Sequence, residues 1–419
     1  MKPLKFAKIF VSVIIILLCS CKPEQVILSG GVSGVITDSS TGNTIENATV
    51  KLNPLTDSAL SRSDGRFDFI HIEQGEYQLQ VTKHGYTKYL KTIFVTPANA
   101  KEANVVLSES PVLRLSDTYL DLGFEILGAV KISNGGIREF TYNITSSQSW
   151  IKIHPSEGEI NDNTDTIAIS IDRSELSRDK HKENIIITSA VGDQSVQDTV
   201  FIYVNGLVDS RDMKFYGIVK IGTQIWISEN LNVGKMVIQG TDQTESQIIE
   251  KYCYNDDPVG CNIYGGMYQW KSAMQNAPSD SGIIGTTRGI CPTGWHIPTL
   301  KEWDVLIDYN GGIENAGNSL RATGTSHWDP PNSDADNNSG FSALPAGYYL
   351  APTLLEIGFF ESGLWTGFWS ATFTSPPDDP GRPLLSYGIG EAPYMFWQSW
   401  AVADAISVRC IKDPETKRK

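Results

Sequence analysis

The feature that most constrains the fold is an alternation of apolar and polar residues with a period of two. It recurs in short runs, whose apolar members between residues 31 and 108 are Val50, Leu52, Phe67, Phe69, Tyr77, Leu79 and Val81. Turn-forming clusters such as Ser63-Asp64-Gly65 separate the runs. Because successive side chains of a β-strand point to opposite faces, each run predicts a strand with one buried face. Residues 31–108 are therefore expected to form a small antiparallel β-sandwich.

The same alternation continues from residue 110 to residue 205. Its apolar members are Phe140, Tyr142, Ile144, Ile167, Ile169, Ile171, Ile185, Ile187, Val200, Ile202 and Val204. A second β-sandwich is expected here, because several short alternating strands in succession are typical of that architecture.

The composition changes in residues 208–413, which hold nine of the ten tryptophans. Thr299 with Glu302 forms the signature of a helix capping box, and an apolar stripe follows at helical spacing. Helices together with short strands and long loops predict an α+β domain in this region.

The first 20 residues resemble a lipoprotein signal peptide. Three lysines precede an apolar run over residues 9–18, which suits a signal peptide and is too short to span a bilayer. The run ends in Leu18-Cys19-Ser20-Cys21, which is similar to a bacterial lipobox whose last cysteine is acylated. We expect cleavage after Ser20, a tether over residues 21–30, and anchoring to the outer membrane through lipid on Cys21. The anchored chain would face the cell surface or the periplasm.

The charge of the chain excludes some partners. The 419 residues include 48 acidic and 34 basic side chains, for a formal net charge of -14. Proteins that bind a nucleic-acid backbone carry clustered Lys and Arg, whereas the basic residues here are few and scattered. We therefore expect no nucleic-acid partner.

Residues 31–108 resemble a carboxypeptidase regulatory-like domain. The resemblance rests on Gly34-Val-Ile-Thr-Asp, Ser63-Asp-Gly-Arg-Phe67, Gly75-Glu-Tyr77 and Gly85-Tyr86, in that order. In that family the module is a transthyretin-like sandwich without catalytic residues, and it accompanies other domains.

Residues 110–205 are similar to a BACON domain, an immunoglobulin-like sandwich common in surface proteins of Bacteroidetes. The similarity rests on Trp150-Ile-Lys-Ile-His154-Pro-Ser-Glu-Gly158 and on the Ile-rich strands that follow. The family has a Gly-Xaa-Tyr turn where this chain has Asp179-Lys-His-Lys-Glu183.

Residues 208–413 resemble the Fibrobacter succinogenes major paralogous domain. The motifs include Cys291-Pro-Thr-Gly-Trp-His-Ile-Pro-Thr-Leu-Lys-Glu-Trp303, Gly340-Phe-Ser-Ala-Leu-Pro-Ala-Gly347 and Ser407-Val-Arg-Cys-Ile-Lys412. The Trp-His-Ile-Pro-Thr and Val-Arg-Cys stretches are also similar to the formylglycine-generating enzyme family. Because that family has a C-type-lectin-like fold, the resemblance implies the same fold for this domain.

The cysteines outside the signal and the lipid site are Cys253, Cys261, Cys291 and Cys410. Four cysteines in an exported chain allow three disulfide pairings. We favour Cys253–Cys261, across a short turn, and Cys291–Cys410, which would tie the approach to the predicted helix to the last strand. A Cys-based metal site would need closer paired spacings, such as Cys-Xaa-Xaa-Cys.

Asp334, Asp336 and Asn338 imitate the start of an EF-hand calcium loop. Ser339 and Pro345 stand where that loop requires Gly and Glu, so it is not an EF-hand. An irregular Ca²⁺ site and a solvated turn are the two interpretations of this loop. We expect no other cofactor or metal.

The candidate ligand-binding residues are Trp328, Trp365, Trp397 and Trp400. They lie in loop-like segments rich in Gly, Pro and Ser, and exposed flat rings can stack on sugars or peptides. Packing beneath long loops is the alternative role. We expect no catalytic residues, and the sequence has no Gly-Xaa-Ser-Xaa-Gly nucleophile elbow.

These features favour a non-catalytic lipoprotein of the cell envelope. Two β-sandwiches would form a stalk, and the C-terminal domain would bind a glycan or an extracellular protein, as in adhesion. One alternative is an envelope enzyme, similar to the formylglycine-generating enzymes or of another kind, which would need a reactive thiol or a metal. The other alternative is a structural envelope or fimbria-like component.

Overall fold

The computed structural model describes residues 29–97, 100–136, 138–161, 163–243, 248–351, 358–373 and 384–414. The expected signal peptide and the lipidated Cys21 lie outside the described residues, so both stay predictions. The chain divides into two compact units. The first comprises residues up to Val112 together with Gly136–Arg138 and Val191–Gln194, and the second comprises the remainder.

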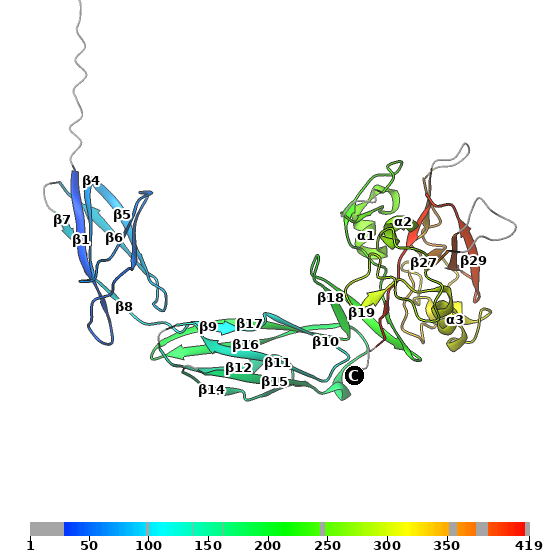
Figure 1. Ribbon diagram of the computed structural model, residues 1–419, viewed down its shortest axis with the longest axis horizontal. Helices are drawn as coiled ribbons and strands as arrows, with labels where there is room; N and C mark the ends of the chain where they lie inside the picture. Colours follow the sequence, from blue (N-terminus) through cyan, green and yellow to red (C-terminus); the bar gives the residue numbers. More distant parts are fainter. Residues whose placement is uncertain are drawn as a thin grey trace, which may run out of the picture. The chain divides into compact units, whose positions relative to one another are not determined.

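The first unit contains two β-sheets (Figure 1). In one sheet, β1 (Ser29–Asp38) pairs with β4 (Arg66–Glu73), β7 (Ala100–Glu102) and β8 (Val105–Leu107). The other sheet has the order β3 (Ser58–Leu60), β2 (Thr49–Asn53), β5 (Gly75–Thr82) and β6 (Tyr89–Val95). Every apolar residue of the predicted alternating runs is buried in the core between them. The sandwich is not wholly antiparallel, because β7 and β8 run parallel to β1.

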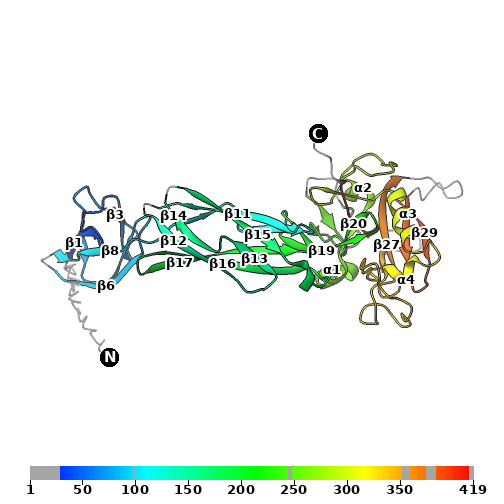
Figure 2. The same cartoon turned by 90° about the horizontal axis from the view of Figure 1, so that it is seen from below.

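The second unit begins with another two-sheet sandwich, seen from two sides in Figure 1 and Figure 2. One sheet has the order β10 (Tyr119–Gly123), β17 (Gln194–Val204), β16 (His181–Val191), β12 (Phe140–Ser146) and β14 (Glu157–Ile160). The other has the order β13 (Ile151–His154), β15 (Thr164–Ile171), β11 (Leu127–Asn134) and β9 (Leu113–Leu115). A 3-10 turn (Arg173–Glu175) lies in the connection between β15 and β16. The alternating isoleucines of β15 and β16 supply much of the buried core, as their spacing predicts.

The C-terminal region of the second unit contains two further sheets, of five and seven strands, and a two-stranded pair. The first has the order β18 (Gly206–Asp209), β19 (Lys214–Ile221), β20 (Gln224–Ile227), β31 (Ile411–Lys412) and β24 (Trp295–His296). The second has the order β26 (Gly358–Phe360), β25 (Tyr348–Leu350), β30 (Ala405–Ser407), β27 (Thr366–Phe373), β28 (Leu384–Ile389) and β29 (Met395–Trp400). β23 (Met267–Gln269) also pairs with β30, and β21 (Lys235–Met236) pairs with β22 (Glu250–Lys251).

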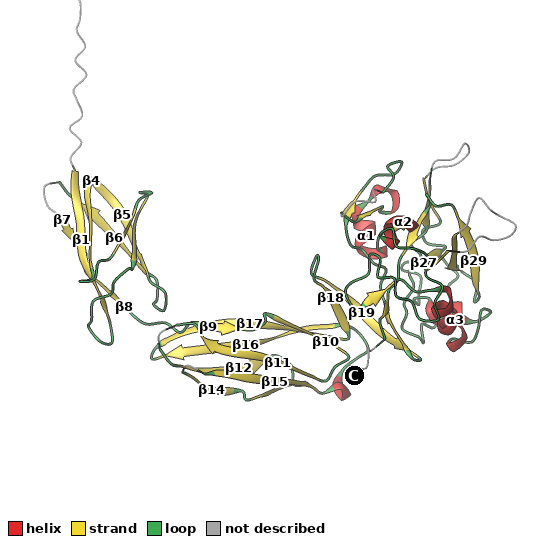
Figure 3. Cartoon of the chain, in the orientation of Figure 1, coloured by secondary structure: helices red, strands yellow, loops and turns green. Residues whose placement is uncertain are grey.

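The four α-helices of the described residues all lie in this region, where Figure 3 shows them in red. They are α1 (Pro258–Tyr264), α2 (Trp270–Met274), α3 (Leu300–Tyr309) and α4 (Ala316–Leu320), and a 3-10 turn (Tyr254–Asp256) precedes α1. The predicted capping box is confirmed: the Thr299 side chain accepts from the Glu302 backbone N–H, and the Glu302 carboxylate accepts from the Thr299 N–H. The predicted stripe of Trp303, Leu306 and Ile307 is buried against the sheet residues of the core.

The described part of the chain is mostly β-sheet and has several domains. None of its helices has the length and apolar character that crossing a bilayer requires. The domain boundaries inferred from the sequence stay predictions.

Candidate functional site

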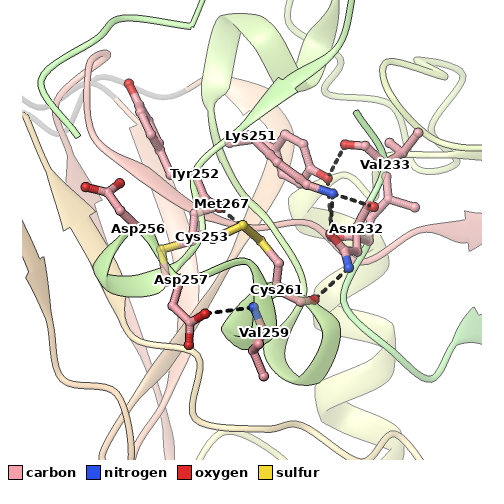
Figure 4. Close-up of a disulfide and its surroundings, with 12 residues drawn as sticks. Asn232, Val233, Lys251, Tyr252, Cys253, Asp256, Asp257, Val259, Cys261 and Met267 are labelled. Atoms are coloured by element: carbon pink, nitrogen blue, oxygen red, sulfur yellow. Dashed lines mark hydrogen bonds between the residues drawn. A yellow bond between two sulfur atoms is a disulfide. The ribbon is translucent and has the colours of Figure 1, made fainter. Parts of the chain in front are cut away.

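The four cysteines of the C-terminal region form two disulfides. Cys253 pairs with Cys261, with Cα atoms 5.1 Å apart, and Cys291 pairs with Cys410, with Cα atoms 5.9 Å apart. Both predicted pairings are confirmed. Figure 4 shows that the first bridge joins Cys261 of α1 to Cys253, which lies shortly after β22 and directly before the 3-10 turn. None of these four thiols is available as a nucleophile or metal ligand in the oxidised structure.

Three of the four candidate tryptophans are buried in the core. Trp328 is 1% exposed and donates from Nε1 to the Ala343 carbonyl, 3.0 Å away. Trp400 is 1% exposed and donates to the Ser386 hydroxyl, 2.7 Å away, while Trp365 packs against its ring. The expectation that these three rings contact a ligand at the surface is corrected, because their faces are covered and two of their N–H groups are already bonded. Here the packing alternative applies.

The predicted calcium candidates make local contacts. Asp336 accepts hydrogen bonds from the backbone and side-chain amides of Asn338, at 2.9 and 2.7 Å, and Asp334 accepts one from Ser333, at 3.2 Å. Within the described ranges, no three or more His, Cys, Asp and Glu side chains group so as to hold a metal ion. The contacts are those of a hydrogen-bonded turn.

Trp397 is the one candidate tryptophan that stays largely exposed. Its exposed fraction is 46%, and it lies on β29, at the end of the strand order of its sheet. Directly across from it on β28 is Tyr387, which is buried, and the two ring centroids are 4.3 Å apart. Tyr394, just before β29, is also exposed. The two rings are tilted by 38°, and the exposed ring packs against the buried one; we call Trp397 and Tyr387 the aromatic platform.

Acidic side chains of α3 lie beside the aromatic platform. The Tyr387 hydroxyl donates a hydrogen bond to the Asp304 carboxylate. Burial, this hydrogen bond and the negative charges of Asp304 and Asp308 raise the pKa of Tyr387, so its hydroxyl remains a donor at neutral pH. Both carboxylates belong to exposed residues of α3. The hydroxyl end of Tyr387 therefore lies near two carboxylates, which are strong hydrogen-bond acceptors.

A separate polar cleft of about 310 Å³ lies in the same region of the chain. It is bounded by β19, the segment after β20, the end of α1, and Arg409 in the short connection between β30 and β31. Its lining includes Lys214, Tyr216, Glu229, Asn230, Tyr264 and Arg409. Hydrogen bonds join these lining residues to one another: Asn230 donates to the Tyr264 carbonyl, at 2.8 Å, and accepts from Arg409 Nε, at 2.7 Å.

The cleft borders the first disulfide. Asn232 donates from Nδ2 to the Cys261 carbonyl, 2.6 Å away, and its own oxygens accept from Lys251 Nζ, at 2.5 and 2.9 Å. Figure 4 shows these contacts beside the bridge. Sequence reasoning did not identify the cleft; its one local signal was the charged Arg409 in the otherwise apolar Val-Arg-Cys motif.

His296 is buried between two carboxylates. Its Nε2 is 3.0 Å from Glu302 Oε1, and its Nδ1 is 2.7 Å from Asp413 Oδ1. Burial by itself lowers the pKa of His296, but the hydrogen bonds to Glu302 and Asp413 and their negative charges outweigh burial. The pKa is therefore raised above its ordinary value of 6.5. This arrangement connects α3 to the segment after β31.

Three segments of the chain match family models. Residues 219–412 match the Fibrobacter succinogenes major domain, residues 31–108 the carboxypeptidase regulatory-like domain, and residues 128–204 the viral BACON domain. The three domain resemblances seen in the sequence are therefore confirmed. The search of curated proteins found no match.

Several solved structures align with parts of the chain. A PapD-like domain of human CEP192 is 7% identical over 22% of this chain and 82% of its own, with a TM-score of 0.20. The major pilin subunit of Bacillus cereus is 12% identical over 46% and 75%, with a TM-score of 0.20. A putative carbohydrate binding protein from Bacteroides uniformis is 10% identical over 42% and 97%, with a TM-score of 0.18. Similarities this low carry no argument about function.

The disulfides and the domain families together indicate a secreted or cell-envelope protein. Disulfides form and persist in oxidising compartments, and a bridge that closes a long loop in the core is of the structural kind.

Proposed function

We propose that this chain is a non-catalytic lipoprotein of the bacterial cell envelope whose C-terminal domain binds a glycan. Lipid on Cys21 anchors it to the outer membrane, and the two sandwich domains connect the anchor to the binding domain. The C-terminal domain has the C-type-lectin-like fold that its family resemblance implies. The observation that carries the proposal is the exposed Trp397 ring, which packs against a buried tyrosine whose hydroxyl is bonded to the carboxylate of Asp304.

The aromatic platform suits a sugar for two physical reasons. The apolar face of a pyranose ring can cover the exposed indole, which removes apolar surface from water. The carboxylates of Asp304 and Asp308 can accept hydrogen bonds from the sugar hydroxyls at the edge of that ring. Because Tyr387 is buried and hydrogen-bonded, it holds Trp397 in place before a ligand arrives, which reduces the entropic cost of binding.

The disulfides support binding rather than the thiol chemistry of the formylglycine-generating enzymes. Cys410 occupies the shared Val-Arg-Cys motif, and its sulfur is bonded to Cys291. Neither cysteine is exposed. A buried bridge that closes a loop of 119 residues has the properties of a structural crosslink.

A glycan array tests the proposal. The probe is the mature chain from residue 21 with Cys21→Ser, which carries no lipid, compared with the same chain carrying Trp397→Ala. We expect the substitution to weaken binding to any recognised glycan at least tenfold, because buried tryptophans at the centre of an interface commonly contribute 2 kcal/mol or more. Trp397 is about half exposed and lies on the last strand of its sheet order, so its removal should lower the melting temperature by only a few degrees, and the variant should remain folded at the temperature of the array.

Phe94→Ala is the matched control. Phe94 is an exposed aromatic residue of β6 in the first unit, and its removal should leave glycan binding unchanged. Equal binding by wild type and Trp397→Ala would refute the platform, and failure to recognise any glycan would refute the proposed ligand class.

Fractionation of cells that express wild type or Cys21→Ser tests the anchor. The wild-type protein should sediment with the outer membrane and label with radioactive palmitate, because several acyl chains together give stable membrane attachment. The Cys21→Ser chain should carry no label. Palmitate label that survives this substitution would show that the lipid is attached elsewhere.

A further inference from the structure

The polar cleft contains a buried cation whose hydrogen-bond acceptors are neutral. Arg409 is 1% exposed and donates to the Asn230 side-chain oxygen and to the carbonyls of Phe341, Ile227 and Ser342. In the described part of the chain, no carboxylate lies within ion-pair distance of its guanidinium. A buried charge without an ion-pair partner is costly, although the negative charge of Glu229 and the rings of Phe341 and Phe368 offset part of that cost.

Two further cations converge on the neighbouring backbone. The ammonium groups of Lys214 and Lys251 both donate to the carbonyl of Asn232, at 2.5 and 2.9 Å. Burial, with a smaller contribution from repulsion by Lys214, lowers the pKa of Lys251 to about 8. The nearest carboxylate to Lys214 is that of Asp212, at 3.9 Å, which is the limit of an ion pair.

The carboxylate that lines the cleft is already paired. Glu229 accepts from Lys180 Nζ, at 2.6 Å, and from the backbone N–H of Gly217, at 2.8 Å. Four cations, Arg409, Lys214, Lys251 and Lys180, therefore outnumber the two carboxylates that act on them, those of Glu229 and Asp212. Asp209 also acts on Lys214 but is paired with Arg211. This excess of positive charge is local, since the whole chain carries a formal net charge of -14. A concave site with an excess of one sign in a protein of the opposite sign raises the local concentration of its counter-ion.

We infer that this cleft binds the carboxylate of an acidic sugar, with the part-exposed Lys214 on the anion, Arg409 adding positive charge beneath it, and neutral polar groups on the sugar hydroxyls. The inference rests on the proposed glycan binding for the nature of the ligand, but on residues separate from the aromatic platform. The lining includes Ser228, Asn262, Tyr264 and Ser342, whose hydroxyl and amide groups can bond to sugar hydroxyls. A volume of about 310 Å³ is at the small end of ligand pockets, which suits a single sugar unit.

Calorimetric titration of the mature Cys21→Ser chain tests the inference. The probes are glucuronic acid, glucose and inorganic sulfate. We expect glucuronic acid to bind at least tenfold more tightly than glucose, because hydrogen bonds to a charged group are stronger than neutral ones. Its affinity should fall as salt rises. Glucuronic acid should also bind more tightly than sulfate, which cannot use the groups that bond to hydroxyls.

Lys214→Gln is the decisive variant, because glutamine can still donate to the Asn232 carbonyl but carries no charge. It should weaken the binding of glucuronic acid at least fivefold, whereas Lys91→Gln, on the exposed β6 of the first unit, should not. Equal affinity for glucose and glucuronic acid, or an unchanged affinity in Lys214→Gln, would overturn the inference. Sulfate binding as tightly as glucuronic acid would reduce the cleft to an unspecific anion site and would also overturn it.

The Trp397→Ala chain separates this inference from the proposed function. If glycan-array binding depends on Trp397 but glucuronic acid does not bind, the aromatic platform stands and the anion site fails. If Trp397→Ala binds glucuronic acid as the wild type does while no array signal depends on Trp397, the anion site stands and the platform fails.

Discussion

The two disulfides should differ about twofold in their contribution to stability. In the chain-entropy treatment, a crosslink lowers the entropy of the unfolded chain by an amount that increases with the logarithm of the number of residues in the loop that it closes. The loops differ greatly: Cys291–Cys410 spans 119 residues and Cys253–Cys261 spans 8. These separations correspond to about 5 kcal/mol for the long loop and about 2.5 kcal/mol for the short one at 25 °C.

The short bridge is a well-matched control for the long one. All four cysteines are buried, with exposed fractions of 3% or less, so replacing either pair by alanine removes two buried sulfur atoms. The cost of the lost packing is therefore similar in the two double variants. The difference between them, about 2.4 kcal/mol, isolates the effect of loop length.

Urea unfolding followed by tryptophan fluorescence measures this difference. Nine of the ten tryptophans lie in residues 208–413, so the signal reports on the domain that holds both bridges. We expect Cys291→Ala/Cys410→Ala to lose about 5 kcal/mol of unfolding free energy and Cys253→Ala/Cys261→Ala about 2.5 kcal/mol. Equal losses in the two variants, or a larger loss from opening the short loop, would refute the loop-entropy reasoning.

Three further predictions concern single side chains. The pKa of His296 is raised in the folded state, so protonated His296 contributes its full stabilisation below pH 6.5, and this stabilisation is lost as pH rises through the folded pKa. The stability advantage of wild type over His296→Gln in urea titrations should therefore shrink between pH 6 and pH 9. A growing advantage would contradict the pairing of His296 with Glu302 and Asp413. Thr299→Ala removes the buried cap of α3 and should cost about 1–2 kcal/mol by the same fluorescence assay, whereas an unchanged midpoint would show that the cap is dispensable. Ile187→Ala leaves a cavity in the second sandwich and should cost about 2–5 kcal/mol, measured by far-ultraviolet circular dichroism in urea; a loss under about 1 kcal/mol would mean that the sandwich collapses around the site.

Local patterns in the sequence were sufficient to identify the strands, the main helix and the domain order. The period-two runs of both sandwiches are buried as their spacing predicts, because strand geometry relates each side chain to its second neighbour. The capping box at Thr299 and Glu302 is also local, because both partners lie within one helical turn. The favoured disulfide pairing, one of the three that four cysteines allow, is also confirmed.

Packing between distant segments determined which residues could form a site. Trp365, Trp397 and Trp400 have similar sequence surroundings, yet the first and last are buried and the middle one is exposed. The Tyr387–Asp304 contact joins residues 83 positions apart, and no local pattern encodes it. Whether a side chain is covered depends on the strands and helices that fold over it, which the short-range periodicity of a sequence does not record.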